Sequence, residues 1–136
     1  MEQGKQVAAV TVVGEAGAPR YVQKIQSGKH ALLADEGAVL GGADAGPAPF
    51  AYVLSGLGAC TSITLRMYAE RKGWDLGTVT VRLRFLREEA GIRVEREVAL
   101  GGALSGEQRQ RLAELCEKTP VTLALKGGIP IATTLT

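Results

Sequence analysis

The sequence is short of the residues that most often identify a protein's chemistry. It has 136 residues, with two cysteines, one histidine and a formal net charge of +2. Cys60 and Cys116 have no CxxC or histidine-rich spacing around them, which excludes a recognisable zinc site and a dense disulfide framework. The small net charge, with acids and bases interspersed, argues against nucleic-acid binding. We therefore expect no metal, no cofactor and no nucleic-acid partner.

Further absences narrow the class of protein. Residues 1–6 are polar and lack the apolar core of a secretion signal, so both thiols are expected in a reducing cytosol. The uncharged stretch from Ala45 to Leu65 is long enough for a membrane span, but its prolines, glycines, serines and threonines make it a poor one. A serine elbow and a phosphate-binding loop are both missing, so hydrolase and nucleotide-binding functions have no support. We expect a cytoplasmic protein without membrane contact.

What the sequence does contain predicts a single α+β domain over residues 1–136. Hydrophobic residues make up 46% of the chain, which is enough to form a core. Alternating patterns predict strands, and apolar repeats at steps of three and four predict helices. The predicted strands are 7–13, 20–26, 30–34, 78–87, 92–100 and 129–135, and the predicted helices are 50–72 and 105–118. Ser105 and Gln108 have capping-box spacing, and Pro120 is expected to end the second helix.

The segments 78–87 and 92–100 alternate apolar and charged residues, which predicts a hairpin with one face in water. Its charged side chains are expected to form solvated cross-strand pairs. They are Arg82, Arg84, Arg93, Glu95, Arg96 and Glu97.

The first predicted helix is apolar nearly all round in its first half. Val53, Leu57, Cys60, Thr64 and Met67 recur at steps of three and four, and a neighbouring stripe holds Leu54, Thr61, Leu65 and Tyr68. One short chain has little material to cover such a helix. A second copy of the chain is therefore expected to cover the rest, in a homodimer.

Cys60 is the first candidate for chemistry. Neighbouring glycines leave room beside its sulfur, and the hydroxyls of Thr61, Ser62 and Thr64 could hydrogen-bond a thiolate. The alternative is packing, because a thiol buried in apolar surroundings is inert. Cys116 lies on the inward stripe of the second helix and is expected to be a core thiol, although two buried helices could still bring it to Cys60.

Several segments together resemble the OsmC/Ohr family, and its OsmC-like branch most closely. They are Gly46-Pro-Ala-Pro-Phe50, Leu57-Gly-Ala-Cys-Thr61, Leu65-Arg-Met-Tyr-Ala-Glu-Arg-Lys72 and Pro120-Val121. The resemblance covers nearly the whole chain. It implies antiparallel sheets packed on long central helices, in an intertwined homodimer whose active sites use both subunits. It also implies reduction of hydroperoxides during oxidative stress, with a thiol or dithiol as reductant.

Carried over to this chain, the resemblance makes Cys60 the peroxidatic cysteine and a second thiol its resolving partner. Apolar neighbours of Cys60 favour organic hydroperoxides. The sequence departs from the family in two places. Thr119 stands where the family has its resolving cysteine, and Cys116 lies three residues upstream. We therefore expect the step between Cys116 and Cys60 to be slow.

The second departure concerns the groups that activate the thiol. Catalytic members use an arginine from the preceding loop and a glutamate just after the proline pair. In this chain Phe50, Ala51 and Tyr52 follow Pro49, and no lysine or arginine occurs between positions 30 and 65. A cation from elsewhere, such as Arg20, could replace the arginine. These departures argue against efficient peroxidase activity. Two hypotheses stay open: a working thiol peroxidase of low activity, and a non-catalytic dimer that binds a small apolar molecule at the subunit interface.

Overall fold

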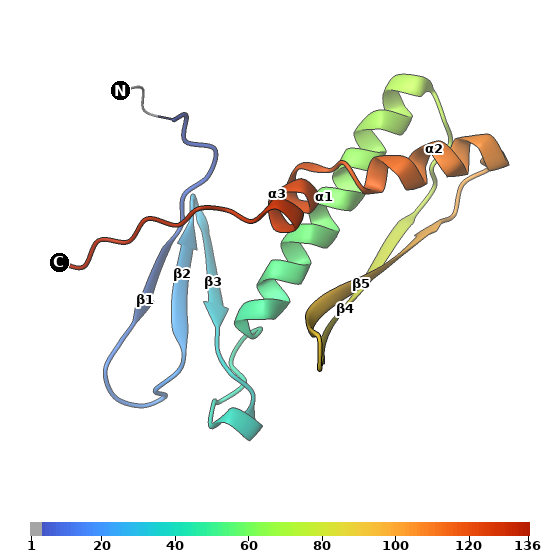
Figure 1. Cartoon of the computed structure of the whole chain (residues 1–136). Helices are drawn as coiled ribbons and strands as arrows, with labels where there is room; N and C mark the ends of the chain where they lie inside the picture. The colour runs from blue at the N-terminus through green and yellow to red at the C-terminus, as the bar shows by residue number, and fades with distance from the viewer. Residues whose placement is uncertain (1–3) are drawn as a thin grey trace. The chain divides into compact units, whose positions relative to one another are not determined.

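We describe the protein from a computed structural model, in which residues 4–136 are placed (Figure 1). The chain forms two compact units that divide between Tyr52 and Val53, inside the helix α1 (Pro49–Lys72). Both units combine helical and antiparallel strand structure, which confirms the α+β class predicted from the sequence.

The first unit is built on a three-stranded antiparallel sheet. Its strands are β1 (Thr11–Gly14), β2 (Gln23–Ser27) and β3 (His30–Ala34), in the order β1-β2-β3. Their existence confirms the three predicted strands, and β3 has the predicted bounds. Each of the other two begins later than the alternation suggested, because residues 7–10 and 20–22 make no strand pairing in this structure.

The loop after β3 is organised by one buried carboxylate. Asp35 is 2% exposed and accepts hydrogen bonds from the backbone N–H groups of Glu36 at 2.7 Å and of Ala43 and Ala45 at 3.1 Å. The backbone N–H of Ala45, helped by the other two, lowers the pKa of the Asp35 carboxyl against the opposing effect of burial. The loop contains a short 3₁₀ helix, η1 (Ala38–Leu40), and leads to Pro49, the first residue of α1. Proline suits this position because its missing N–H would have no partner in the first helical turn.

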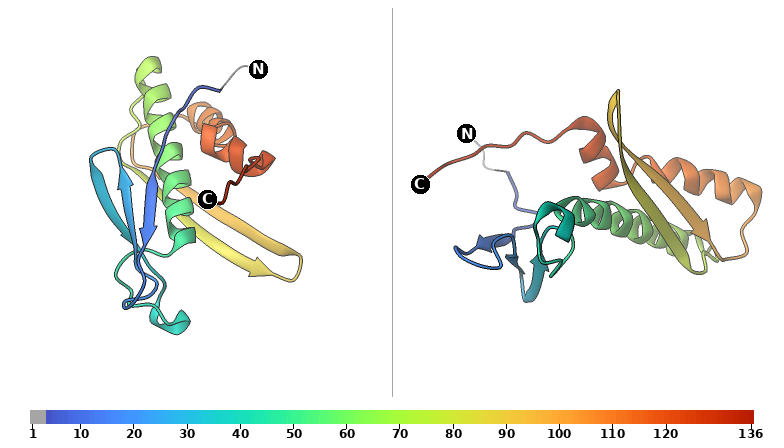
Figure 2. Two further views of the ribbon diagram at one scale, coloured as in Figure 1. Left: turned by 90° about the vertical axis from the view of Figure 1, so that its left-hand side faces the viewer. Right: turned by 90° about the horizontal axis from the view of Figure 1, so that it is seen from below.

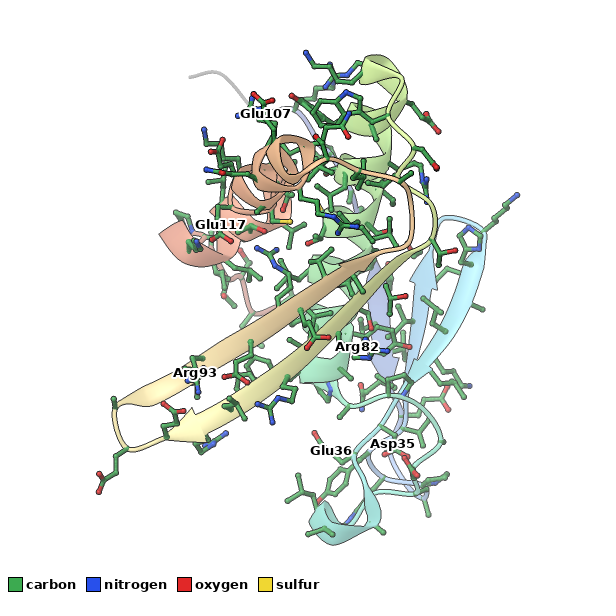
Figure 3. All side chains as sticks on the ribbon, turned by 90° about the vertical axis from the view of Figure 1, so that its right-hand side faces the viewer. Asp35, Glu36, Arg82, Arg93, Glu107 and Glu117 are labelled. Carbon is green, nitrogen blue, oxygen red and sulfur yellow. The ribbon has the colours of Figure 1, made fainter. Side chains whose placement is uncertain are left out.

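A long hairpin follows α1 in the second unit. Strands β4 (Val79–Glu88) and β5 (Gly91–Leu100) pair antiparallel over ten residues each, as the sequence predicted. Side chains such as Arg82 and Arg93 lie on its surface (Figure 3). The ion pairs of this face join Arg82 to Glu97, Arg84 to Glu95, and Arg93 to Glu88 and Glu95. Most of the predicted solvated pairs are therefore confirmed, with one exception described below.

The core of the second unit lies between α1, the hairpin and the helix α2 (Gly106–Cys116); Figure 2 gives two further views of these elements. Its buried members are Leu65, Ala69, Leu76, Leu112 and Cys116. Gly58 lets α1 approach the hairpin, because a Cβ at this position would lie 2.8 Å from Leu83 Cδ1. The capping box at Ser105 and Gln108 is present as predicted.

Of the two apolar stripes predicted on α1, the one with Thr61 and Leu65 is the more deeply buried. The residues that are buried are Leu57, Gly58, Thr61, Leu65 and Ala69. Val53 and Met67, both on the other stripe, are 41% and 60% exposed. The reason is close packing: Gly58 lets the hairpin approach this side of the helix, and Leu65 and Ala69 pack in the core with residues of α2.

The C-terminal part of the chain corrects two further predictions. Helix α2 ends at Cys116, and Pro120 begins a new helix, α3 (Pro120–Gly127), which the sequence analysis missed. Proline is compatible with the first position of a helix as well as with the end of one. The strand predicted at 129–135 is wrong, because these residues form no regular structure. An edge strand requires a partner strand, and the described chain pairs none with this segment. Among residues 4–136, no helix is long and apolar enough to span a membrane.

Candidate active site

Cys60 lies in the middle of α1 and is half-buried. Its sulfur is 3.9 Å from the hydroxyl oxygen of Thr64, one helical turn further along, so one of the three hydroxyls proposed from the sequence does approach the thiol. Cys60 therefore keeps part of its surface in solvent. Packing alone would favour full burial of a small apolar side chain such as cysteine.

The residue after Cys60 makes a different set of contacts. Thr61 is fully buried, and its hydroxyl donates to the carbonyl of Leu57 at 2.7 Å. The same hydroxyl oxygen accepts a hydrogen bond of 2.9 Å from Nη1 of Arg96 on β5. Thr61 is therefore not the hydroxyl available to Cys60, and a guanidinium is bonded to the residue next to the candidate nucleophile.

Arg96 is the residue that the sequence analysis misplaced. It was expected in a solvated pair on the hairpin surface, but its side chain is only 12% exposed. Register explains the difference, because Arg96 pairs with Leu83 and shares its face of β5 with Val98 and Leu100, which pack against the core. The signal was present in the sequence: Arg96 occupies an apolar position of the alternating pattern, where a charge is unusual.

The guanidinium of Arg96 joins four groups from three helices or their ends. Nη1 donates to the hydroxyls of Thr61 at 2.9 Å and Thr122 at 2.8 Å, and Nη2 donates to the carbonyl of Cys116 at 2.9 Å and to the carboxylate of Glu117 at 3.2 Å. We call Arg96 with these four groups the Arg96 clamp. Glu117, labelled in Figure 3, is also paired with Lys126, which is the main reason that the pKa of Glu117 is lowered.

The second cysteine lies at this junction between α2 and α3. Cys116 is 8% exposed and belongs to the core, as predicted. Burial raises the pKa of its thiol; the positive charge of Arg96 opposes this effect and the negative charge of Glu117 adds to it. Cys116 is the last residue of α2, so its carbonyl lies in the turn where helices leave carbonyls without a partner. Arg96 supplies that partner.

Thr119 occupies the position of the resolving cysteine in the OsmC/Ohr pattern. It is fully buried, begins α3 as its N-cap residue, and its hydroxyl oxygen lies 2.6 Å from that of Thr122. Through Thr122 this position contacts the Arg96 clamp. Position 119 is therefore linked to the residue after Cys60 only indirectly, through Thr122 and Arg96.

Other basic residues considered for thiol activation have partners of their own. Arg66 donates to the carbonyl of Gly77 at 2.5 Å. Arg20 belongs to the first unit, where its guanidinium lies over the Tyr21 ring at 4.6 Å. Among residues 4–136, no group of three or more histidine, cysteine, aspartate or glutamate side chains is arranged to hold a metal ion.

Comparison with known proteins identifies the family. The family described as OsmC-like protein matches residues 41–134, which include Cys60, Arg96 and Cys116. The chain belongs to this OsmC-like family. No curated protein sequence matches the chain.

Solved structures show the same fold. The OsmC-like protein of Mycoplasma pneumoniae is similar with a TM-score of 0.77 and 18% identity, over 91% of this chain and 90% of that one. An organic hydroperoxide resistance protein OsmC of Legionella pneumophila, also described as a predicted redox protein, gives a TM-score of 0.67 and 18% identity over 92% and 93%. The organic hydroperoxide resistance protein OhrB of Bacillus subtilis gives 0.61 and 20% over 90% and 92%. At these identities the likeness shows the OsmC fold.

Proposed function

We propose that this OsmC-like protein reduces hydroperoxides, organic ones above all, with Cys60 as the nucleophile. The observation that carries the proposal is the contrast between the two thiols within an OsmC fold. Cys60 is half-buried beside the Thr64 hydroxyl, whereas Cys116 is buried in the core with a raised pKa. A thiol buried in the core reacts poorly, so the more exposed Cys60 is the group that meets the peroxide first. Two solved structures of similar fold are named organic hydroperoxide resistance proteins, which supports the same chemistry.

The reaction is a two-electron reduction of the peroxide. The Cys60 thiolate attacks one oxygen of the O–O bond, an S–O bond forms, the O–O bond breaks, and the alkoxide takes a proton and leaves as an alcohol. The oxidised Cys60 is a sulfenic acid. A thiol then attacks its sulfur, water leaves, and a further thiol from a monothiol or dithiol reductant restores Cys60. The presence of two free thiols suits a reducing compartment such as the cytosol.

We also propose that the protein acts as a homodimer. Val53, Ile63 and Met67 of α1 are 41%, 53% and 60% exposed, so a long helix presents apolar side chains to solvent. A second copy would bury them, and the family resemblance favours the same assembly.

A binding function is the second candidate. The same exposed apolar side chains of α1 could line a site for a small apolar molecule at the subunit interface, with Cys60 retained for packing. The two functions differ in what happens to the Cys60 sulfur.

The deciding experiment titrates fully reduced protein with one equivalent of an organic hydroperoxide and follows the intact mass. If Cys60 is the nucleophile, the parent and Cys116→Ser should both consume peroxide. The intact mass should then increase by one oxygen atom for a sulfenic acid or decrease by two hydrogen atoms for a disulfide. Cys60→Ser should consume none. Peroxide consumption by Cys60→Ser at the parent's rate would show that Cys60 is not the reacting group, and an unreactive parent would favour the binding function.

A further inference from the structure

The Arg96 clamp suggests how the redox cycle of Cys60 is completed. The Arg96 side chain is 12% exposed, and its guanidinium donates to Thr61 on α1, to the last carbonyl of α2 at Cys116, to the Glu117 carboxylate and to Thr122 on α3. A buried guanidinium is stable only when its N–H groups have partners, because a charge without them is costly to remove from water. The contacts therefore depend on one another and hold the three helices in one arrangement.

The two cysteines are held on different faces of this arrangement. On α1, Cys60 and Thr64 are one turn apart on one line, whereas Thr61 and Leu65 form the neighbouring line, rotated by about 100°. The Cys116 side chain packs in the core with Leu65, on the second line, and the Cys60 sulfur lies next to Thr64, on the first. A disulfide needs close approach of both Cβ atoms. The Cys116 carbonyl is held by Arg96 and its side chain packs in the core, and both contacts oppose movement of Cys116 toward Cys60.

We propose that the Arg96 clamp is a positioning device that restrains Cys116, so that a sulfenic acid at Cys60 is resolved by an external small thiol and not by Cys116. The proposal rests on the proposed function for its sulfenic acid, and Arg96 acts in it only through the residues that it holds. The clamp holds the chain at the Cys116 carbonyl and at two later residues, Glu117 and Thr122.

Both competing steps start from the same oxidised cysteine. In the internal step the Cys116 sulfur attacks the Cys60 sulfur, an S–S bond forms, the S–O bond breaks, and hydroxide leaves with the thiol proton as water. In the external step a small thiol forms the same type of bond and also releases water. A second molecule of that thiol then displaces Cys60 and is oxidised with the first to a free disulfide. The clamp affects only the first of these routes.

The test measures the internal step without any peroxide. The full-length protein is prepared with 5-thio-2-nitrobenzoate attached to Cys60 as a mixed disulfide. Attack by Cys116 forms the Cys60–Cys116 disulfide and releases the coloured thiolate, so the rate of release reports how readily Cys116 reaches Cys60. Cys116→Ser should release none and sets the baseline.

The clamp is weakened by Thr122→Val, which removes one acceptor of Arg96. We expect release of the coloured thiolate to be slow in the parent and about tenfold faster or more in Thr122→Val. The free energy of one hydrogen bond to a charged group corresponds to a factor of about ten or more in rate. Glu117→Ala, at an exposed position, is a second variant that keeps the fold and should change the rate in the same direction. Fast release in the parent, or equal rates in the parent and both variants, would overturn the proposal.

A general loss of stability must be separated from release of the clamp. Leu76→Ala removes a fully buried side chain from the same core and leaves all the clamp groups unchanged. It should lower stability without accelerating release, and acceleration equal to that of Thr122→Val would refute the clamp. The pH dependence gives an independent reading.

The pH dependence of the release rate reports the pKa of the attacking Cys116 thiol. The charged groups that act on it are Arg96 of β5 and Glu117 at the end of α2, and burial is the main cause of its raised pKa. Opening the clamp exposes the thiol, so the midpoint of the rate against pH should fall in Thr122→Val and stay at the parent's value in Leu76→Ala. An unchanged midpoint in Thr122→Val would contradict the proposal.

The outcome separates this inference from the proposed function. If hydroperoxide does not oxidise Cys60 but the mixed-disulfide rates behave as expected, the peroxidase proposal fails and the restraint on Cys116 is upheld. If hydroperoxide oxidises Cys60 and the parent forms the internal disulfide promptly, the peroxidase proposal holds and the clamp proposal is wrong.

Discussion

The structure makes a quantitative prediction about two arginines of the same hairpin. Arg96 and Arg84 lie on opposite faces of the β4–β5 ladder, with side chains 12% and 69% exposed. We predict that Arg96→Met destabilises the protein strongly and that the matched substitution Arg84→Met has a much smaller effect. Methionine has a similar length and no charge, so the comparison isolates the buried hydrogen bonds from side-chain volume.

The expected cost follows from the groups that Arg96 leaves behind. The hydroxyls of Thr61 and Thr122 keep other partners, the Leu57 carbonyl and the Thr119 hydroxyl, and so lose only part of their hydrogen bonding. The carbonyl of Cys116 loses a charge-assisted donor in the core, and a buried acceptor left without one costs about 1–3 kcal/mol. Glu117 is 57% exposed and keeps its pair with Lys126, so no buried charge is left without a partner. Each of the other three hydrogen bonds to the charged Arg96 contributes about 1.5–3 kcal/mol. Removal of the desolvation penalty of Arg96 offsets part of this, so we expect a net loss of about 3 kcal/mol.

Urea unfolding at a fixed protomer concentration measures this loss. With a urea dependence of about 1–3 kcal/mol per molar for a protein of this size, the midpoint of Arg96→Met should fall by about 1–3 M. The concentration is fixed because the apparent stability of the proposed dimer would depend on it. Arg84 is in a solvent-exposed ion pair, which contributes little to stability, so its variant should unfold near the parent. Equal midpoints for the two variants would refute the assignment of Arg96 as the residue that joins the helices.

The remaining predictions concern the loop, the second thiol and the assembly. Because the folded-state pKa of Asp35 is lowered, its stabilisation of the loop should be present above the ordinary aspartate pKa and be lost as pH falls through the lowered value. Hydrogen exchange at the N–H groups of Ala43 and Ala45 should show this pH dependence in the parent and not in Asp35→Asn. Identical pH profiles for the two proteins would disprove it. The double change Cys116→Ala and Thr119→Cys should form a disulfide with Cys60 promptly after one equivalent of peroxide, and persistence of both free thiols would show that position 119 does not reach Cys60. Light scattering should find a dimer at micromolar concentration, and a stable folded monomer would contradict the homodimer.

The limits of the sequence analysis are clearest at Arg96. Alternation along residues 92–100 correctly predicted a strand, because a strand's side-chain period of two depends on local geometry. The same alternation placed Arg96 among the apolar positions of the strand, but its charge led us to expect its side chain in solvent. Which of the two prevails depends on whether acceptors exist inside, and those acceptors are supplied by Thr61, Thr122 and the end of α2, far away in the sequence.

The sequence by itself determined the family, the strand and helix classes of most segments, and Cys60 as the candidate nucleophile. These depend on local patterns: alternation, helical spacing, the capping box at Ser105 and short motifs around the cysteine. Tertiary structure decided the rest. The inward side of α1 depends on which side chains are small enough for the hairpin to approach. The end of α2 and the start of α3 depend on whether Pro120 ends one helix or begins the next. The environment of Cys116 depends on a guanidinium from another element, because long-range hydrogen bonds form only when packing brings their partners together.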